Sequence, residues 1–247
     1  MTSQGVDIAL NPENPAPWFN RALVLIHLDT IEDAKTSYTH AKVLFEKNGN
    51  KLGMAATLFQ MGTIVQNRDP SEAVKLFNES LRISRSINDK MQQAAVIHHL
   101  GMIEQTRNHY GEARRPYNES LRIKQELGDR SVMAVTLANL GQIELNEWDS
   151  DRKRTHLDAA ERLYKESLDI LNESGDAVGI ANVLHQMYKV EYWKGNLPLA
   201  KKFYDQSEAL KRELQEKQAR IRKWHTGKEK IRQASDKVGP SSVCAHH

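Results

Sequence analysis

The sequence predicts an all-α protein, a solenoid of about five helix–turn–helix repeats that ends in a long C-terminal capping helix. Related phrases recur along the chain, as in LFNESLRISRSIND from Leu76 and PYNESLRIKQELGD from Pro116. The phrases end in a helix stop followed by a helix cap, as in the pair Gly128-Asp129. No stretch alternates with a period of two over enough residues for a strand, so we expect helices alone.

One alanine marks the second helix of each of the five repeats, and successive alanines are 39, 40, 47 and 40 residues apart. An aromatic residue follows each alanine four positions later, on the same helical face. Roughly twelve positions earlier, on the partner helix, four repeats carry a small residue, and Tyr188 is the exception. The aromatic ring fills the hole beside the small residue, and one hairpin cannot bury such a face alone, so neighbouring repeats must stack. The predicted structural core comprises Ala34, Ala73, Ala113, Ala160, Ala200, Tyr38, Phe77, Tyr117, Tyr164 and Tyr204.

These positions divide the chain into four regions. We expect an N-terminal segment over residues 1–13, a repeat domain over 14–216, a basic helical extension over 217–237 and a flexible tail over 238–247. The five repeats are predicted at about residues 14–50, 51–90, 91–130, 131–176 and 177–216.

The pattern resembles the tetratricopeptide repeat family over about residues 14–216. Its repeat length of about 40 residues is similar to that of the longer-helix subclass, which is found in kinesin light chains, in spindle-orientation adaptors and in many bacterial regulators. The resemblance implies a right-handed superhelix whose first helices line a concave groove. It also implies that amides along such a groove grip the backbone of an extended peptide.

One position, two residues before the small residue, can both donate and accept hydrogen bonds in every repeat. We name these five residues the polar ladder: Asn20, Gln60, His99, Asn139 and Gln186. The further candidates for a peptide-binding groove are His98, His185, Phe59, Met102, Gln142, Asn67 and Asn146. The alternative is that these polar residues merely face solvent on exposed helices.

Two features depart from the repeat. Seven additional residues fall within 146–157, and we interpret them as a charged surface loop or a protruding partner contact. Seven residues are also about two helical turns, so both helices could lengthen instead. Pro116 lies inside a predicted second helix, where it removes a backbone hydrogen bond, and it predicts a kink or a late helix start.

The C-terminal extension is strongly basic. Residues 209–237 contain 10 Lys and Arg against 4 Asp and Glu, which leaves the rest of the chain slightly acidic. We expect a capping helix there, and the alternatives are a homodimer seam or a surface for nucleic acid or an anionic membrane. The candidate contact residues of this basic extension are Lys217, Arg220, Arg222, Lys223, Lys228, Lys230 and Arg232.

The sequence predicts no enzyme, no cofactor and no metal site. It contains no phosphate-binding glycine loop, no HExxH and no CxxC motif, and no carboxylate is evident beside its ten scattered histidines. The lone cysteine, Cys244, excludes an intrachain disulfide and suits a reducing compartment. The N-terminus lacks the pattern of a signal peptide, and no apolar run is long enough to span a bilayer, so we expect a cytoplasmic protein.

We therefore expect an interaction scaffold or adaptor that binds a peptide segment of a partner protein in the groove of its repeats. One alternative is binding of nucleic acid or an anionic surface through the basic C-terminal helix. Another is a regulatory protein that senses a small peptide.

Overall fold

The computed structural model describes residues 11–237, without the side chains of Ser131, Val132 and residues 225–237. The predicted flexible tail, the first ten residues of the N-terminal segment and the side chains of Lys228, Lys230 and Arg232 lie outside this description. The described residues form ten α-helices and no strand, which confirms the prediction of an all-α repeat solenoid. The chain divides into two compact units, Met1–Ile170 and Leu171–His247.

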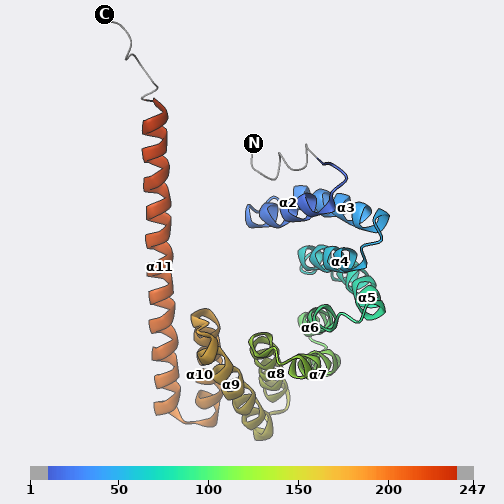
Figure 1. Ribbon diagram of the computed structural model, residues 1–247. Coiled ribbons are helices and arrows are strands. Elements are labelled where there is room, and N and C mark those ends of the chain that lie inside the picture. Colours follow the sequence, from blue (N-terminus) through green and yellow to red (C-terminus); the bar gives the residue numbers. More distant parts are fainter. Residues whose placement is uncertain (1–10, 238–247) are drawn as a thin grey trace, which may run out of the picture. The chain divides into compact units, whose positions relative to one another are not determined.

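The first unit contains three complete hairpins and most of a fourth (Figure 1). Within it, the two helices of each complete hairpin pack on each other, and the second helix of one hairpin contacts the first helix of the next. The helices are α2 (Pro15–His27) and α3 (Ile31–Lys47), α4 (Lys51–Val65) and α5 (Pro70–Ser86), α6 (Lys90–Thr106) and α7 (Tyr110–Leu127), and α8 (Arg130–Asp151) and α9 (Arg154–Ser174).

Local sequence sets where the helices begin and end. The side chain of Asp69 accepts hydrogen bonds from the backbone N–H groups of Ser71 and Glu72, and Pro70 occupies the first helical position of α5. At the other end of a helix, Gly128 adopts a left-handed conformation with φ of 68°, which ends α7.

The small residues of the first helices touch the aromatic residues of the second. A β-carbon built on Gly62 would lie 2.5 Å from the ring of Phe77, and one on Gly141 would lie 2.8 Å from the ring of Tyr164. Both rings are completely buried. The position therefore requires glycine or another very small residue so that the aromatic side chain can enter the gap.

A serine hydrogen bond joins the two helices of most hairpins. Ser80, Ser120 and Ser167 each donate a hydroxyl hydrogen to a backbone carbonyl of the preceding helix, at distances of 2.7, 2.7 and 2.8 Å. All three serines are fully buried. The small size of this position was evident from the sequence, but its hydrogen-bonding role was not.

The seven additional residues of the fourth hairpin are helical, so the interpretation as a charged surface loop is wrong. Helix α8 extends to Asp151 and α9 begins at Arg154, which leaves two residues between them. Trp148 and Leu157 are both buried, and this burial of apolar side chains explains why the added residues continue both helices instead of forming a loop.

The expectation of a late helix start at Pro116 is also wrong. Helix α7 begins at Tyr110 and continues through Pro116 to Leu127. Ala113 and Tyr117, on either side of the proline, are completely buried, so tertiary packing holds the turns that the missing hydrogen bond weakens.

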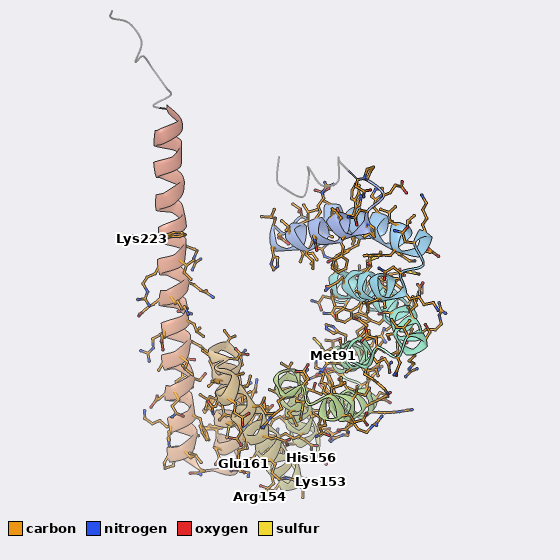
Figure 2. All side chains as sticks on the ribbon, in the orientation of Figure 1. Met91, Lys153, Arg154, His156, Glu161 and Lys223 are labelled. Carbon is orange, nitrogen blue, oxygen red and sulfur yellow. The ribbon has the colours of Figure 1, made fainter. Side chains whose placement is uncertain are left out.

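The second unit contains the end of α9, helix α10 (Ala177–Lys194) and helix α11 (Leu197–Lys237). Ala200 and Ser207 of α11 are buried, and Leu210 and Leu214 are half-buried. Every side chain from 215 to 224 is exposed. The basic extension therefore continues the second helix of the last hairpin, and Lys223 lies on its exposed part (Figure 2). No helix among the described residues has the length and apolar character needed to cross a membrane.

Candidate functional site

The polar ladder lies on the first helices of the repeats. In the first unit Asn20 is exposed on α2, whereas Gln60, His99 and Asn139 are half-buried on α4, α6 and α8. In the second unit Gln186 is half-buried on α10, and its Oε1 atom has no hydrogen-bond partner among the described residues. Half-burial fixes these side chains while leaving part of each accessible to a ligand.

His99 is held by contacts within the stack. Its Nδ1 atom lies 2.9 Å from Oε1 of Gln66, and its ring meets that of Phe59 edge-on, with 5.0 Å between the centroids. Burial, with a smaller effect of the Lys124 charge, lowers the pKa of His99 to about 4, so the imidazole is neutral at physiological pH. Nδ1 then carries the hydrogen donated to Gln66, and Nε2 remains an acceptor.

The amides of the ladder keep local contacts. The Thr63 hydroxyl lies 3.4 Å from Oε1 of Gln60, and Asn139 hydrogen-bonds the buried Tyr117 hydroxyl. The remaining polar candidates differ in their state. Nε2 of Gln142 donates to Oδ1 of Asn146 over 3.0 Å, so these two amides partly satisfy each other, and Asn67 is exposed.

The apolar candidates and His185 are only partly accessible. Phe59 and Met102 are half-buried and pack against the buried core of the first unit. His185 is half-buried on α10, its ring lies 5.7 Å from that of Tyr188, and its Nδ1 atom has no hydrogen-bond partner among the described residues.

The assignment of His98 to the groove requires correction, because its side chain is buried, with 6% exposed. Its Nδ1 atom lies 3.0 Å from the Thr136 hydroxyl, which also accepts a hydrogen bond of 2.9 Å from Lys124 Nζ. Burial lowers the pKa of His98 to about 3 and that of Lys124 to about 8. These residues form a buried polar chain that connects α6, α7 and α8.

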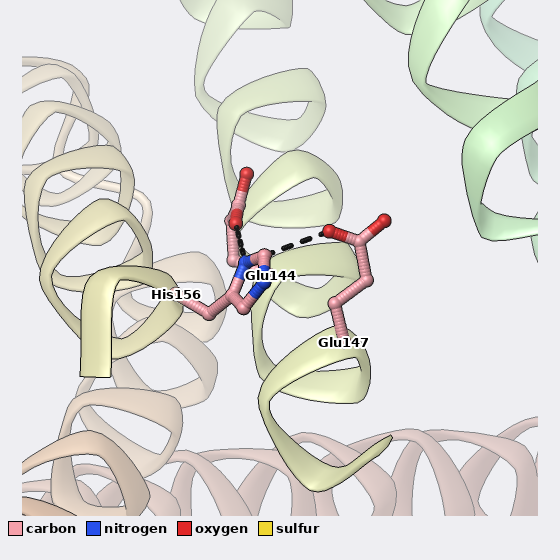
Figure 3. A group of neighbouring side chains, drawn as sticks. All are labelled: Glu144, Glu147 and His156. Carbon is pink, nitrogen blue, oxygen red and sulfur yellow. Dashed lines mark hydrogen bonds and ion pairs between the residues drawn. The ribbon is translucent and has the colours of Figure 1, made fainter. Parts of the chain in front are cut away.

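The structure brings together a cluster that the sequence did not reveal, formed by Glu144, Glu147 and His156 (Figure 3). His156 Nδ1 lies 2.7 Å from Glu144 and 3.5 Å from Glu147, and its Nε2 lies 3.4 Å from Asp151. Arg114 of α7 forms ion pairs with both glutamates. The hydrogen bond to Glu144 raises the pKa of His156, and the three carboxylates add to this effect.

Each of the three clustered residues could offer one ligand atom to a metal ion. The Arg114 guanidinium already balances the two glutamates, so the arrangement as it stands is an ion-pair network that joins α7, α8 and α9. The sequence signal was weak, because Glu144 and Glu147 are one turn apart but His156 follows nine residues later. Only the lengthening of both helices places it opposite them.

Comparisons with known proteins agree with the helical repeat fold. Residues 65–126 match the sequence model of a family described as Tetratricopeptide repeat. No curated protein sequence matches the chain.

Several solved structures share the fold. BtubC (BKLC) from P. vanneervenii is similar with a TM-score of 0.60 at 16% identity, over 87% of this chain and 93% of that one. A Rap protein complexed with Competence and Sporulation Factor has a TM-score of 0.65 at 14% identity, over 79% of this chain and 53% of that one. NprR in complex with its cognate peptide NprX has a TM-score of 0.57 at 18% identity, over 78% and 54%. This chain thus spans about half the length of the Rap and NprR chains.

Proposed function

We propose that this chain, a tetratricopeptide repeat protein, is an interaction scaffold that holds an extended segment of a partner protein along the first helices of its repeats. The observation that carries the proposal is the ladder in the first unit, where Gln60, His99 and Asn139 are partly accessible at one repeated position. A primary amide can satisfy both the N–H and the C=O of a peptide backbone, and the neutral His99 ring offers an acceptor.

Two of the similar structures support a peptide as the ligand. The Rap structure was solved with Competence and Sporulation Factor, and the NprR structure with its cognate peptide. In this chain, Phe59 and Met102 lie on the same helices as the ladder and are partly accessible, so they are candidate contacts for the side chains of a bound segment.

The test is affinity purification from the native lysate, followed by binding measurements with synthetic peptides that span the recovered protein. We expect Gln60→Ala with Asn139→Ala to weaken peptide binding by roughly tenfold to hundredfold, because two hydrogen bonds to the peptide are lost. The matched control is Asn78→Ala with Asn118→Ala, two exposed amides on the second helices. Equal affinity of the wild type and the ladder variant would show that the ladder is not the binding site.

The exposed basic stretch of α11 favours a second candidate function, which is binding of nucleic acid or an anionic surface. Lys217, Arg220 and Lys223 are all exposed on one continuous helix. Binding of a labelled RNA or DNA oligonucleotide should fall steeply with salt. Arg220→Gln with Lys223→Gln should reduce that salt dependence, whereas Lys51→Gln with Lys90→Gln, at two exposed lysines elsewhere, should not. Equal effects of the two pairs would exclude a specific role for α11.

A further inference from the structure

The repeats of the first unit share a face that the first helix of the following repeat covers. Gln66, at the end of α4, lies with its Oε1 atom 2.9 Å from Nδ1 of His99 on α6. Phe77 of α5 contacts the same histidine, with 5.4 Å between the ring centroids. One repeat later, Arg114 of α7 forms ion pairs with Glu144 and Glu147 of α8. The face thus combines a position on the first helix with two positions on the second helix.

The last hairpin, in the second unit, has different residues at these positions. Tyr192 corresponds to Gln66, Lys201 to Arg114 and Tyr204 to Phe77. We name the tyrosine face by its residues, which are Tyr188, Tyr192, Leu197, Lys201 and Tyr204. Together with Ala200 they line a cavity of about 370 Å³ between α10 and α11.

The tyrosine face is exposed where its counterparts are covered. Tyr192, Leu197 and Tyr204 are 53%, 58% and 43% exposed, whereas Phe77 and Tyr117 are completely buried. The assignment of Tyr204 to the buried core therefore requires correction. The physical reason is Tyr188, which stands where other repeats carry glycine or alanine and whose ring lies 5.3 Å from that of Tyr204 in an edge-on contact.

We propose that the tyrosine face docks an amphipathic α-helix of a partner protein that carries a carboxylate opposite Lys201. The face corresponds to the one that the first helix of the next repeat covers within the first unit, so a helix is the element whose shape it fits. Large, rigid aromatic side chains with polar tips are the residues that most often anchor an interface.

The charge at the face supports a carboxylate on the docked helix. Arg114, at the position that corresponds to Lys201, is matched by two glutamates of the covering helix. Lys201 is at present 3.0 Å from Asp205, one turn away on its own helix, with both side chains well exposed. An exposed pair of this kind contributes little to stability, so Lys201 can exchange Asp205 for a carboxylate of the partner.

The chain itself supplies a probe for the test. A peptide of residues 130–151 has the sequence of α8, the helix whose Glu144 and Glu147 cover Arg114 in the third repeat. This peptide, held helical by a hydrocarbon staple and labelled with a fluorophore, is titrated with the full-length protein while anisotropy is measured. We expect saturable binding that Tyr192→Ser with Tyr204→Ser weakens by at least about tenfold.

Three controls make the result specific. Val178→Ser removes an apolar residue of α10 that is 53% exposed and lies outside the face, and it should leave the affinity unchanged. A probe with Glu144→Gln and Glu147→Gln should bind the wild type more weakly, and Lys201→Gln should abolish the difference between the two probes. The ladder variant with Gln60→Ala and Asn139→Ala should bind the probe as the wild type does, which separates this proposal from the proposed function.

Several outcomes would overturn the proposal. One is equal affinity of the tyrosine variant and the wild type for the probe, and another is the lack of saturation up to about 1 mM protein. A concentration-dependent dimer of the wild type in sedimentation, lost in the tyrosine variant, would assign the face to a second copy of the chain. If the tyrosine variant loses helicity, Lys201→Glu tests the same face with both rings in place, and an unchanged affinity there would refute the proposal.

Discussion

The ring of Phe77 on α5 occupies the space beside Gly62 on α4, so that a β-carbon at residue 62 would lie 2.5 Å from it. Real β-carbons do not approach other atoms so closely, and the ring is completely buried with no room to retreat. This contact between a glycine and an aromatic ring sets how closely the two helices of the hairpin approach.

Substitution Gly62→Ala should destabilise the protein by about 1–2 kcal/mol, because overpacking outweighs the better helix propensity of alanine. The measurement is the midpoint of urea unfolding followed by circular dichroism. Gly111→Ala is the matched control, since a β-carbon there meets nothing within 4 Å, and it should be neutral or slightly stabilising. Equal effects of the two substitutions would contradict the packing explanation.

Ser120→Ala should cost about 0.5–1.5 kcal/mol, the value of a typical buried hydrogen bond. The hydroxyl of Ser120 donates a hydrogen bond to the carbonyl of Ala94 over 2.7 Å. Alanine removes this hydrogen bond and only slightly reduces the side-chain volume. The first repeat already carries Ala41 at this position, fully buried, so the fold tolerates alanine there. Ser120→Cys fills a similar volume with a much weaker hydrogen-bond donor. If that variant is as stable as the wild type, side-chain volume and not the hydrogen bond accounts for the loss in Ser120→Ala.

The buried His98 should make the protein sensitive to acid. Its pKa is about 3 in the folded state and near 6.5 in the unfolded state, so the unfolded state binds the proton first as the pH falls. Stability should therefore be lost between about pH 6.5 and pH 3, by up to about 1.4 kcal/mol for each pH unit. His98→Asn keeps an acceptor near Thr136 and removes the titration, so its unfolding midpoint should fall less steeply in this range. Parallel pH profiles would exclude His98 as the cause.

His156 should act in the opposite direction. Glu144, Glu147 and Asp151 surround its ring and raise its pKa, while Arg114 balances the two glutamates from α7. Because the folded pKa is above the unfolded value, the stabilisation is complete below about pH 6.5 and is lost as the pH rises through the folded pKa. The thermal midpoint of the wild type should fall across this range relative to that of His156→Gln. An identical dependence in both proteins would show that His156 does not contribute.

The sequence by itself determined the repeat. Residues four apart on a helix share a face whatever the rest of the chain does, and a small residue opposite an aromatic ring is a relationship of volumes. For this reason Ala34, Ala73 and Ala113 were recognisable as core positions, and the structure finds all three completely buried. Asp69 and Pro70 likewise indicated a helix start through interactions that involve only neighbouring residues.

The tertiary structure decided what depends on contacts between helices. His98 and His99 are adjacent in sequence, yet one is enclosed with Thr136 and the other stays partly accessible, because neighbouring side chains on a helix point in different directions. His156 meets Glu144 only because apolar burial extends α8 and α9. Tyr204 has the spacing of a core aromatic residue but is exposed, since Tyr188 fills the gap that glycine leaves open elsewhere. In each case the state of a side chain depends on the space that a different helix leaves for it.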